Sequence, residues 1–584
     1  MSVYVGTPAV GVVDAEDPDG DLLSLQVVTP PRFGQVTLRD DGAFVFLADA
    51  GWTGVDRFAF RASDGAFDAM AWVHVLVAAK PDDLPTGKAV VSGLLTYDDV
   101  PTACDAQGCR LAYAATRARP IRGAVVQLLS AVTPDAPPVA ETVSDSEGSY
   151  QLVARSGATV QLLVLSETRD PPVTVEDNTR DDAVFALASP DFVVGAAVTQ
   201  NVHAESGWSQ GAYAAPRSAA PFSLLDVAYG AGAAMSAVGA LRLPLLRLNW
   251  SERNRPERGD PQLGRIGTSH WDEHEMYILG AAGIDTDEYD DHVLAHEWSH
   301  YFETTMSRCD SIGGSHGFGD LMEPRVAFSE GWANAAAAML LYPSSRYVDT
   351  YGFQQGHGFY FDVEDNDLDD TPGWFSEASV QAIVFDLFDT EQDGVWDTAA
   401  LGIAPIVDAL LTRQRTTPAL TTVFSFIDAL KQANPDAIEQ IDSVVSRHAI
   451  DPIVDPYGSG ETNDAGLGWA LPVYHEAEVD GNEVVLTLVG SPWYGQRNKL
   501  AGNRYVRFRG IDGTVALRLH AEGAVAMYLY HAGRVVTDVS LGCWAGECDR
   551  EVEVALTDVD YVLVVQGLDD RAEEYSCVVA IRRV

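Results

Sequence analysis

Two histidines and the glutamate that follows the first of them form the pattern in this chain with the clearest chemical meaning. His296, Glu297 and His300 stand in the order His-Glu-x-x-His. Residues four apart on a helix lie on one face, so both imidazoles can present ring nitrogens to a single metal ion. Glu297 then projects beside that ion, where its carboxylate can take a proton from a metal-bound water molecule. The pattern predicts a zinc site in which Glu297 is the catalytic general base.

The sequence around this motif favours a helix over residues 286–306. Asp285 is a candidate N-cap, with Glu288 three residues later as in a capping box. Further acidic residues at this end suit the positive end of the helix dipole, and no proline or glycine interrupts the run. We therefore expect one helix that carries both histidines on its inner face.

A catalytic zinc site needs a third protein ligand, because such sites have three protein ligands and one open position. Glu330 is the candidate, since it stands thirty residues after His300 in an Ala-rich run that predicts a second helix. Asn334, one turn further on, could hold the Nδ1–H of His296 and so orient its ring. The alternative interpretation of Glu330 is an ordinary carboxylate near a helix N-terminus.

The two segments together resemble the gluzincin clan of zinc metallopeptidases, the thermolysin-like group, because His296-Glu-x-x-His300 is followed by Glu330-Gly-Trp-x-Asn334. The resemblance implies that the two histidines and Glu330 bind zinc and that the glutamate of the first motif is the base in peptide hydrolysis. It covers residues 209–450 and is specific only at the two helices. This chain departs from thermolysin in a longer gap to the third ligand and in Asn334, where thermolysin has an aspartate.

Peptide hydrolysis also needs a hydrogen-bond donor for the oxyanion of its transition state. The family uses a tyrosine and a histidine that no spacing in this sequence singles out. Five residues are candidates for this donor: His316, Tyr347, Tyr351, His357 and Tyr360. His316 belongs to a Gly-rich loop between the two helices and either faces the cleft or lies on the surface. Residues 275–280 predict a strand at the upper edge of the cleft, where a peptide could pair as an added strand.

The charge of the chain limits its partners. The 584 residues carry 85 acidic and 38 basic side chains, a net charge of −47, with 47% hydrophobic residues for packed cores. Such a surface repels nucleic acid and anionic lipid, so we expect no nucleic-acid partner. The resemblance to metallopeptidases implies a protein or peptide substrate. The length predicts three to five domains, and the oligomeric state stays open.

The sequence predicts a secreted or cell-surface protein without a membrane span. The most apolar stretch, residues 229–241, is too short to cross a bilayer and runs into Arg242. The N-terminus lacks the basic start and apolar run of a signal peptide, so we expect a chain from which that peptide is absent. Four of the six cysteines form two pairs whose spacing is compatible with local disulfides: Cys104 with Cys109, and Cys543 with Cys548. Cys309 and Cys577 remain.

Two β modules are expected before the zinc helices. Residues 1–80 resemble the cadherin-like modules of bacterial surface proteins, with short apolar strands between Asp-Gly turns. Three carboxylates there either bind calcium or form a solvated turn: Asp17, Asp19 and Asp21. Residues 88–205 resemble the transthyretin-like module found beside carboxypeptidases, with an Asp-x-x-Gly-x-Tyr turn at 145–150. Both are expected to be β-sandwiches without chemistry of their own.

The remainder completes a multidomain fold. Residues 209–452 are the expected α+β zincin-type catalytic domain, whose helical C-terminal lobe is predicted from apolar stripes at 375–389, 404–411 and 421–432. The acidic stretch within it is either a calcium loop or a mobile acidic loop, with these candidate ligands: Asp365, Asp367 and Asp369. Residues 469–584 resemble the prepeptidase C-terminal β-sandwich of secreted bacterial peptidases.

These observations lead to a secreted multidomain zinc metallopeptidase, with Zn²⁺ as its cofactor and Ca²⁺ as a candidate second ion. A different class of function is the alternative: a calcium-braced bacterial surface adhesin or assembly protein with a degenerate peptidase core. A zinc hydrolase acting on another bond is a third hypothesis, because the ligands alone do not define the substrate.

Overall fold

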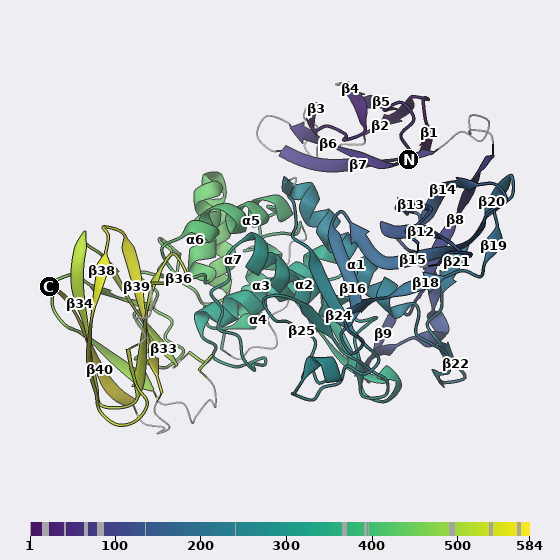
Figure 1. Ribbon diagram of the computed structural model, residues 1–584. Coiled ribbons are helices and arrows are strands. Elements are labelled where there is room, and N and C mark those ends of the chain that lie inside the picture. Colours follow the sequence, from purple (N-terminus) through teal and green to yellow (C-terminus); the bar gives the residue numbers. More distant parts are fainter. Residues whose placement is uncertain are drawn as a thin grey trace. The chain divides into compact units, whose positions relative to one another are not determined.

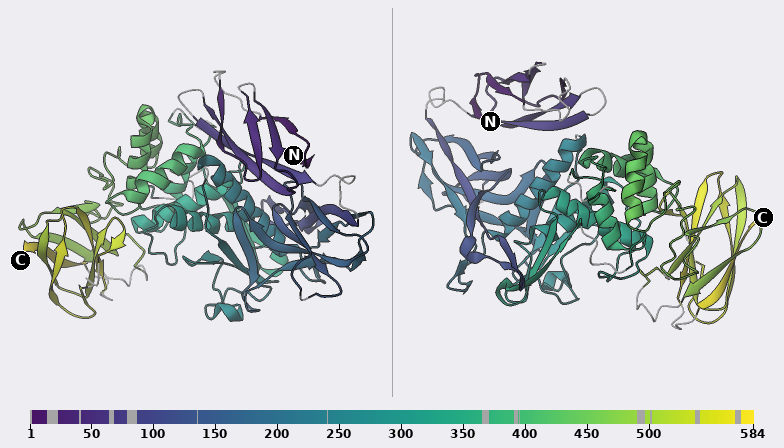
Figure 2. Two further views of the ribbon diagram at one scale, coloured as in Figure 1. Left: turned by 45° about the horizontal axis from the view of Figure 1, so that its top comes forward. Right: turned by 180° about the vertical axis from the view of Figure 1, so that it is seen from behind.

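The computed structural model is multidomain and rich in β-strands, and it divides into two compact units (Figures 1 and 2). The first unit comprises Met1–Tyr301 and Val348–Tyr360, and the second comprises Phe302–Tyr347 and Phe361–Val584. The boundary falls inside helix α2 (Asp291–Met306), which is continuous across it. The structure describes residues 2–13, 23–39, 42–63, 68–78, 87–134, 136–239, 241–364, 371–390, 394, 396–489, 497–500, 502–536, 541–568 and 574–584.

Residues 2–78 form two small sheets that face a shared core. Strand β5 alternates outward and buried side chains, and Phe46, Phe58 and Val75 are fully buried between the sheets. The expected short strands are therefore confirmed, whereas the candidate calcium ligands Asp17, Asp19 and Asp21 lie outside the described residues. The four-stranded sheet has the order β1 (Ser2–Tyr4), β7 (Asp68–Ala78), β6 (Gly54–Ser63), β3 (Ser24–Thr29). The three-stranded sheet has the order β2 (Ala9–Val12), β5 (Ala43–Ala48), β4 (Gly34–Leu38).

The next sheets do not stop at the expected boundary near residue 205. Strand β16 (Pro172–Asp177) pairs in parallel with β24 (Leu246–Trp250), and β24 pairs with β26 (Met276–Ile278). One ten-stranded sheet thus joins the transthyretin-like segment to the strands before the zinc-motif helix. Its other members are β13 (Ala140–Val143), β12 (Ala124–Ser130), β15 (Thr159–Arg169), β17 (Ala183–Val184), β18 (Ala186–Ala188), β19 (Phe192–Val193) and β25 (His270–Trp271).

A five-stranded sheet accompanies it, centred on β8 (Lys88–Asp99), which pairs with strands drawn from both ends of the segment. These partners are β11 (Arg117–Pro120), β14 (Ser149–Arg155), β20 (Ala197–Thr199) and β21 (Val202–Ala204). Short hairpins complete the first unit: β9 (Thr102–Asp105) with β10 (Gly108–Leu111), β22 (Trp208–Ser209) with β23 (Ala212–Tyr213), and β27 (Gly280–Ala281) with β28 (Asp285–Thr286).

Helix α1 (Ala220–Gly239) covers the large sheet where β15 and β16 run. Among the described residues it is the one helix long and apolar enough to cross a membrane, and 56% of its apolar window is buried inside the structure. Ala, Leu and Phe side chains fill this buried face. Burial against the sheet accounts for its apolar character as a core helix.

The predicted helices of the second unit are confirmed, with α7 in addition. Helix α3 (Pro324–Leu340) begins at Glu323, whose side chain accepts from the Arg325 N–H, and it crosses α4 (Glu377–Asp386) at Gly331. A Cβ at Gly331 would lie 2.6 Å from the Cβ of Val380, so only glycine allows the two helices to approach this closely. The others are α5 (Ile403–Ala409), which continues into a π-helical turn (Leu410–Gln414), α6 (Val423–Ala433) and α7 (Ile438–Arg447).

The helix that carries the zinc motif starts later than predicted. It begins at Asp291, whereas Asp285 lies in strand β28 and pairs with Ala281 across the β27–β28 hairpin. The prediction that Asp285 caps this helix is therefore wrong. The acidic residues 285–290 form a hairpin and a turn, because the Asp287 N–H donates to Leu279 and the Asp290 N–H donates to Asp287.

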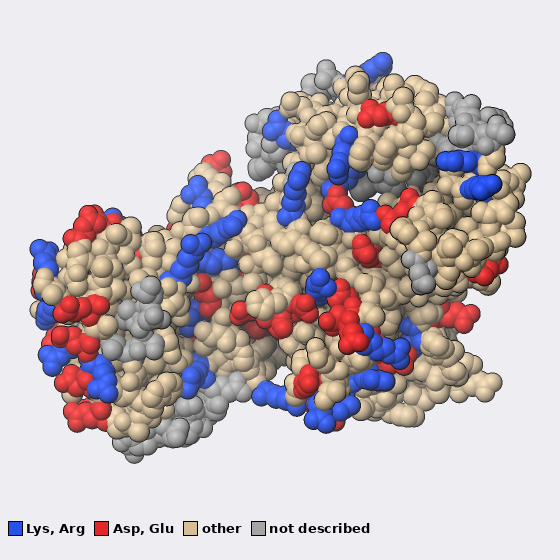
Figure 3. Space-filling view, in the orientation of Figure 1, with Lys and Arg blue, Asp and Glu red and all other residues tan. Residues whose placement is uncertain are grey.

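Residues 474–583 form a β-sandwich of two sheets around a core that includes Leu486, Leu517 and Leu563. In Figures 1 and 2 the two sheets face each other, and in Figure 3 their visible face carries side chains of both signs. The six-stranded sheet contains β31 (Tyr474–Ala477), β33 (Asn503–Arg509), β39 (Asp560–Gly567), β35 (Val525–His531), β36 (Arg534–Val535) and β37 (Leu541–Cys543). The four-stranded sheet has the order β32 (Val484–Val489), β40 (Glu574–Arg583), β34 (Gly513–Ala521), β38 (Cys548–Leu556).

Four cysteines pair as their spacing allowed. Cys104 bonds Cys109 across the β9–β10 hairpin, and Cys543 bonds Cys548 between β37 and β38. Cys309 and Cys577 carry free thiols. Both disulfides are local, so each closes one turn of the chain.

The C-terminal sandwich forms an ion pair and hydrogen bonds with the segment that leads into α3. Lys499 binds Asp320 (Nζ to Oδ2, 2.7 Å), the Leu500 N–H donates to the Leu321 carbonyl, and the Tyr505 hydroxyl donates to Glu323. Glu323 and Tyr505 are buried in this contact. The β-sandwich therefore forms part of the packing that positions the start of α3.

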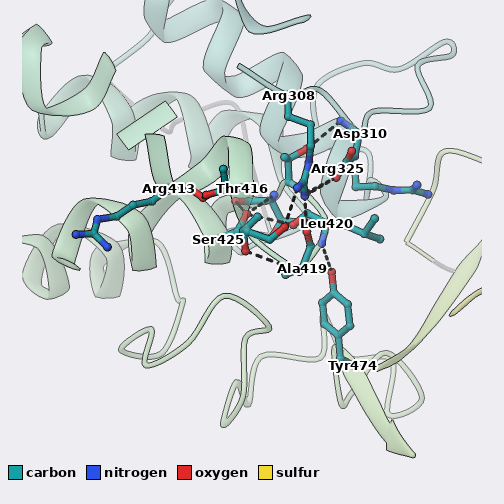
Figure 4. A network of polar contacts seen from close by, with 12 residues as sticks. Arg308, Asp310, Arg325, Arg413, Thr416, Ala419, Leu420, Ser425 and Tyr474 are labelled. Atoms are coloured by element: carbon teal, nitrogen blue, oxygen red, sulfur yellow. Dashed lines mark hydrogen bonds and ion pairs between the residues drawn. The ribbon is translucent and has the colours of Figure 1, made fainter. Parts of the chain in front are cut away.

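A second set of contacts holds the loop that leaves α2. Figure 4 shows Arg308 reaching the Ala419 carbonyl, while the Leu420 N–H donates to the hydroxyl of Tyr474 on β31. Asp310 and Thr421 exchange two further hydrogen bonds of 2.9 Å each. This loop is thereby fixed to both the helical lobe and the sandwich.

Candidate metal centre

The two histidines of the motif point their ring nitrogens at one place. On α2 the Nε2 atoms of His296 and His300 are 3.1 Å apart, with the rings nearly perpendicular at 84°. Two nitrogen ligands of one tetrahedral zinc ion, with bonds of about 2.0–2.1 Å, lie about 3.3 Å apart. The spacing of the two nitrogens therefore fits a shared ion.

The packing of α3 on the second half of α2 brings Glu330 to the same place. Ser329 donates its hydroxyl to Glu303 Oε2 at 2.7 Å, and Glu303 follows His300 by three residues on the same helix face. One ligand atom from each of His296, His300 and Glu330 lies within 4.8 Å of the other two. Glu330 is 7% exposed, so its carboxylate is withdrawn from solvent.

These three donors suit zinc. Two neutral imidazoles and one carboxylate form the donor set of known catalytic zinc sites that keep an open position, and softer or purely oxygen-liganded ions prefer other sets. Cys309 is not a member of this group of ligand atoms, and burial, followed by the charge of Glu303, raises the pKa of its thiol well above the usual value. The site thus has the composition expected from the sequence.

Glu297 is oriented by a backbone group. The Trp271 N–H donates to Glu297 Oε2 at 2.8 Å. Trp271 belongs to the two-residue strand β25, which pairs with β26 on one side and ends the large sheet. Since this N–H is directed at Glu297, it points away from β26 and toward the open edge.

This arrangement corrects the expected edge strand. Residues 275–280 were expected to form the edge, but β26 lies inside the sheet between β24 and β25. The outermost strand is β25, which lies in a Gly- and Arg-rich stretch too short and too polar to predict as a strand. This edge strand lies beside Glu297, the predicted general base.

His316 lies at the carboxylate of the third ligand. Its Nε2 is 3.4 Å from Glu330 Oε2 and 4.0 Å from Glu377 Oε2, and its Nδ1 is 3.0 Å from the Gly314 carbonyl oxygen. A ring nitrogen close to a backbone carbonyl is held in one tautomer, with the proton on Nδ1. Of the five candidate oxyanion donors, His316 is the one whose ring is in contact with a predicted zinc ligand.

The other four candidates lie on the hairpin of β29 (Arg346–Tyr351) and β30 (His357–Asp362). Tyr351 and His357 stack on each other and are exposed. Tyr347 is buried against Phe361, and Tyr360 is exposed. Their role as oxyanion donors stays a prediction.

Asn334 connects α3 to α4. Its Nδ2 donates to Glu377 Oε1 at 2.7 Å and to Gln381 Oε1 at 2.9 Å. The predicted hydrogen bond from His296 would use the amide oxygen instead and stays a prediction. Glu377 was missed from the sequence, although a carboxylate directly after Ser376 at the start of an apolar helix could have drawn attention to it.

The acidic loop could not be placed. Asp365, Asp367 and Asp369, the second set of candidate calcium ligands, lie outside the described residues. The described residues do contain a second carboxylate group able to hold a metal ion, formed by Asp285, Asp287 and Asp349. That group was not anticipated from the sequence as an ion site.

Comparison with known families identifies one module. Residues 2–75 match the bacterial Ig domain family. Bacterial Ig-like domains are typical of extracellular or surface proteins, and this match agrees with accessory β domains. No curated protein matches the chain.

Several solved structures match parts of the chain at low identity. The pre-peptidase C-terminal domain of a Bacillus anthracis collagenase is 9% identical, with 18% of this chain and 93% of that domain covered at a TM-score of 0.14. A human protocadherin-24 fragment is 13% identical over 34% of this chain and 94% of its own, at a TM-score of 0.12. An endo-fucoidan hydrolase of glycoside hydrolase family 107 is 12% identical, with 34% of this chain and 28% of that chain covered at a TM-score of 0.14. Such TM-scores carry no argument about this chain.

Proposed function

We propose that this protein is a secreted zinc-dependent metallopeptidase of the gluzincin type. The observation that carries the proposal is the meeting of His296, His300 and Glu330 ligand atoms within 4.8 Å, with Glu297 on the same helix turn. Zinc held by these three residues would acidify a water molecule and polarise a substrate carbonyl.

In this proposal Glu297 moves the proton. Its Oε2 is held by the Trp271 N–H, so the carboxylate keeps a fixed orientation beside the histidines. Glu297 takes the proton from the attacking water and later delivers it to the leaving amine. His296, His300 and Glu330 would hold the ion.

The edge strand supports a peptide as the substrate. A peptide that pairs with the open side of β25 would lie along the strand whose N–H contacts Glu297. Main-chain pairing of this kind accepts many sequences, because the hydrogen bonds come from backbone groups. A carbonyl of such a peptide would stand next to the base and the zinc ligands.

The proposal is tested by metal content and hydrolysis measured on the same samples. Glu297→Gln should keep about one zinc per chain and lose peptide hydrolysis by roughly 10²- to 10⁴-fold. His296→Ala should lose both zinc and hydrolysis, and Glu439→Gln on the exposed face of α7 is the matched control. Normal turnover by Glu297→Gln would rule out this mechanism.

A surface adhesin is the second candidate, and the bacterial Ig domain at residues 2–75 favours it. In that case the zinc ligands would be a structural remnant without turnover. Cleavage of casein or of a peptide library, with and without a zinc chelator, separates the two functions. Zinc bound at full occupancy with no cleavage of any library peptide would favour the adhesin, and cleavage of a non-peptide bond would favour another zinc hydrolase.

A further inference from the structure

Three aspartates from two segments of the first unit meet before the zinc-motif helix. Asp285 ends the β27–β28 hairpin, Asp287 follows it, and Asp349 lies on β29. One carboxylate oxygen of each lies within 4.8 Å of the other two. Sixty-two residues separate Asp287 from Asp349, so the fold and not local sequence assembles this group.

Asp287 is buried and Asp285 and Asp349 are half-buried, and the main causes of their raised pKa values include no cation among the described residues. Asp287 is 4% exposed; its Oδ2 accepts from Ser269, while its Oδ1 is buried with no hydrogen-bond partner. Asp285 Oδ1 is in the same condition. Arg217 of the first unit pairs instead with Glu288, at 2.7 Å.

The electrostatics of the aspartates reflect this imbalance. Burial and then the carboxylates of Asp285, Asp290 and Asp349 raise the pKa of Asp287 well above its usual value. Burial raises the pKa of Asp349 to about 7, with Asp285 as the second cause. Like charges at this distance either share protons or bind a cation.

A neutral oxygen ligand points to the cation. Gln355 is 1% exposed, and its Oε1 is buried with no hydrogen-bond partner. Its Nε2 donates to the backbone carbonyls of Thr286 and Thr350, at 3.2 and 2.7 Å, so the amide cannot be turned around to hide that oxygen. The same side chain also hydrogen-bonds the carboxylate of Asp285, so Gln355 lies against the group.

The donors are all hard oxygens, which selects the class of ion. Three carboxylates and an amide carbonyl are the ligands of Ca²⁺ in proteins, whereas zinc prefers nitrogen and sulfur. Calcium also accepts the irregular geometry of ligands from two segments, whereas Mg²⁺ demands a near-ideal octahedron. A divalent ion between the three carboxylates removes most of the repulsion among their negative charges.

We propose that Asp285, Asp287 and Asp349 bind a calcium ion, with Gln355 Oε1 as a neutral ligand. The ion ties the hairpin in front of α2 to strand β29. Asp290, which accepts two hydrogen bonds from the Thr350 hydroxyl and one from its N–H, already joins the same two segments next to the start of α2. Calcium at this point fixes the N-terminal end of the helix that carries His296. The proposal does not depend on peptidase activity.

The test uses the full chain and counts calcium ions, because other acidic loops of the chain could bind them too. Isothermal titration with CaCl₂ after EGTA treatment should show one fewer equivalent for Asp349→Asn than for the natural chain, or at least a tenfold weaker site. Thermal unfolding should show a smaller calcium-induced rise in Tm for this variant. Asp408→Asn, at an exposed position on α5, should keep every equivalent.

A second variant guards against a folding defect. Asp285→Asn removes a half-buried carboxylate and should lose the same equivalent, while zinc content measured by atomic absorption stays unchanged. Equal calcium stoichiometry and affinity in the natural chain and both variants would overturn the proposal, as would a natural chain that binds no calcium. Loss of zinc together with calcium would show instead that the variants unfold, and terbium luminescence of the natural chain, displaced by CaCl₂, then decides whether the site exists.

Discussion

Three glutamates near the candidate metal centre differ in their surroundings and therefore suit different roles. Glu297 is half-buried and oriented by a backbone N–H, which suits a group that moves protons. Glu330 is almost fully buried within reach of two imidazoles, which suits a ligand. Glu303 is fully buried and accepts a hydroxyl from α3, so its part is to lock the two helices together.

His316 is the residue whose replacement should be most informative. Its Nε2 lies 3.4 Å from Glu330, and because Nδ1 already donates to the Gly314 carbonyl, Nε2 can donate to an oxyanion only when the ring is an imidazolium. We expect His316→Gln to lower kcat roughly 10²- to 10³-fold with KM and zinc content unchanged. His520→Gln on the C-terminal sandwich, where the side chain is 45% exposed, is the matched control. A loss of zinc from His316→Gln would make His316 a fourth ligand.

The aspartate cluster predicts an unusual pH dependence. The folded-state pKa of Asp349 is about 7, above an unfolded value near 4, so the protonated group stabilises the fold at low pH and this stability is lost as pH rises through about 7. The charges that face it belong to Asp285, Asp287 and Asp290, with Glu288 paired to Arg217.

Without calcium, the free energy of unfolding of the natural chain relative to Asp349→Asn should therefore fall between pH 4 and pH 8. The comparison with the variant is needed because burial lowers the pKa of His292 and His448 to about 4, which gives an opposite slope below pH 6.5. Urea unfolding in EGTA at several pH values measures the difference. Saturating calcium should flatten it, and a flat difference already in EGTA would contradict the assignment of the raised pKa.

At the scale of elements, the crossing of α3 and α4 controls the centre. Glu330 precedes the glycine at which the helices touch, and Glu377 and Gln381 on α4 hold Asn334 of α3. A change in the separation of these helices would move Glu330 and the carboxylate of Glu377 near His316. We therefore expect the candidate metal centre to be sensitive to Gly331, although Gly331 offers no ligand atom itself.

Gly331→Ala tests this dependence. The added Cβ would meet the Val380 Cβ at 2.6 Å and the Glu377 carbonyl at 2.8 Å, so we expect a loss of about 1–3 kcal/mol of stability and weaker zinc binding. Gly230→Ala in α1 is the matched control, since its Cβ would meet only the end of the Arg122 side chain at 3.3 Å. Chemical denaturation and zinc titration measure both effects. Equal behaviour of the two variants would mean that the crossing tolerates a methyl group.

At the scale of the whole molecule, the β modules are not equivalent. The Ig-like module closes its own core with residues such as Phe46 and Phe58. The C-terminal sandwich instead contributes Lys499, Leu500 and Tyr505 to the packing in front of α3. The first has its own core and contacts α1 through Trp72, whose Nε1 donates to the Ser236 carbonyl at 3.3 Å, whereas the second is part of the packing around the segment that leads to Glu330.

A truncation distinguishes these two relations. Removal of residues 469–584 leaves the buried Glu323 and Arg325 without Tyr505, so we expect low solubility, loss of zinc and loss of hydrolysis. Removal of residues 1–78 should leave zinc content and hydrolysis within about twofold, because that module has its own core. Zinc content and hydrolysis by the chain without its sandwich at natural levels would show that the contact is dispensable.

Much of the centre could be predicted because it is local. The four-residue spacing of His296 and His300 has one meaning on a helix, and the Ala-rich run around Glu330 has strong helix propensity. The β modules were likewise predictable from short apolar strands between turns, because strand periodicity and turn residues act over a few positions. Helix boundaries were less secure, as the hairpin at Asp285 shows, because pairing with residue 281 competes there with helix capping.

The amino-acid sequence alone thus decided which residues could bind zinc and which could take a proton, since those properties depend on side-chain type and on spacing within one helix. Only the tertiary structure decided that β25 is the edge strand, that His316 reaches Glu330, and that one sheet runs from the second module to the zinc helix. It also decided that Asp349 joins Asp285 and Asp287. These contacts join residues tens of positions apart, and the packing of whole elements, which no local pattern encodes, sets their distances.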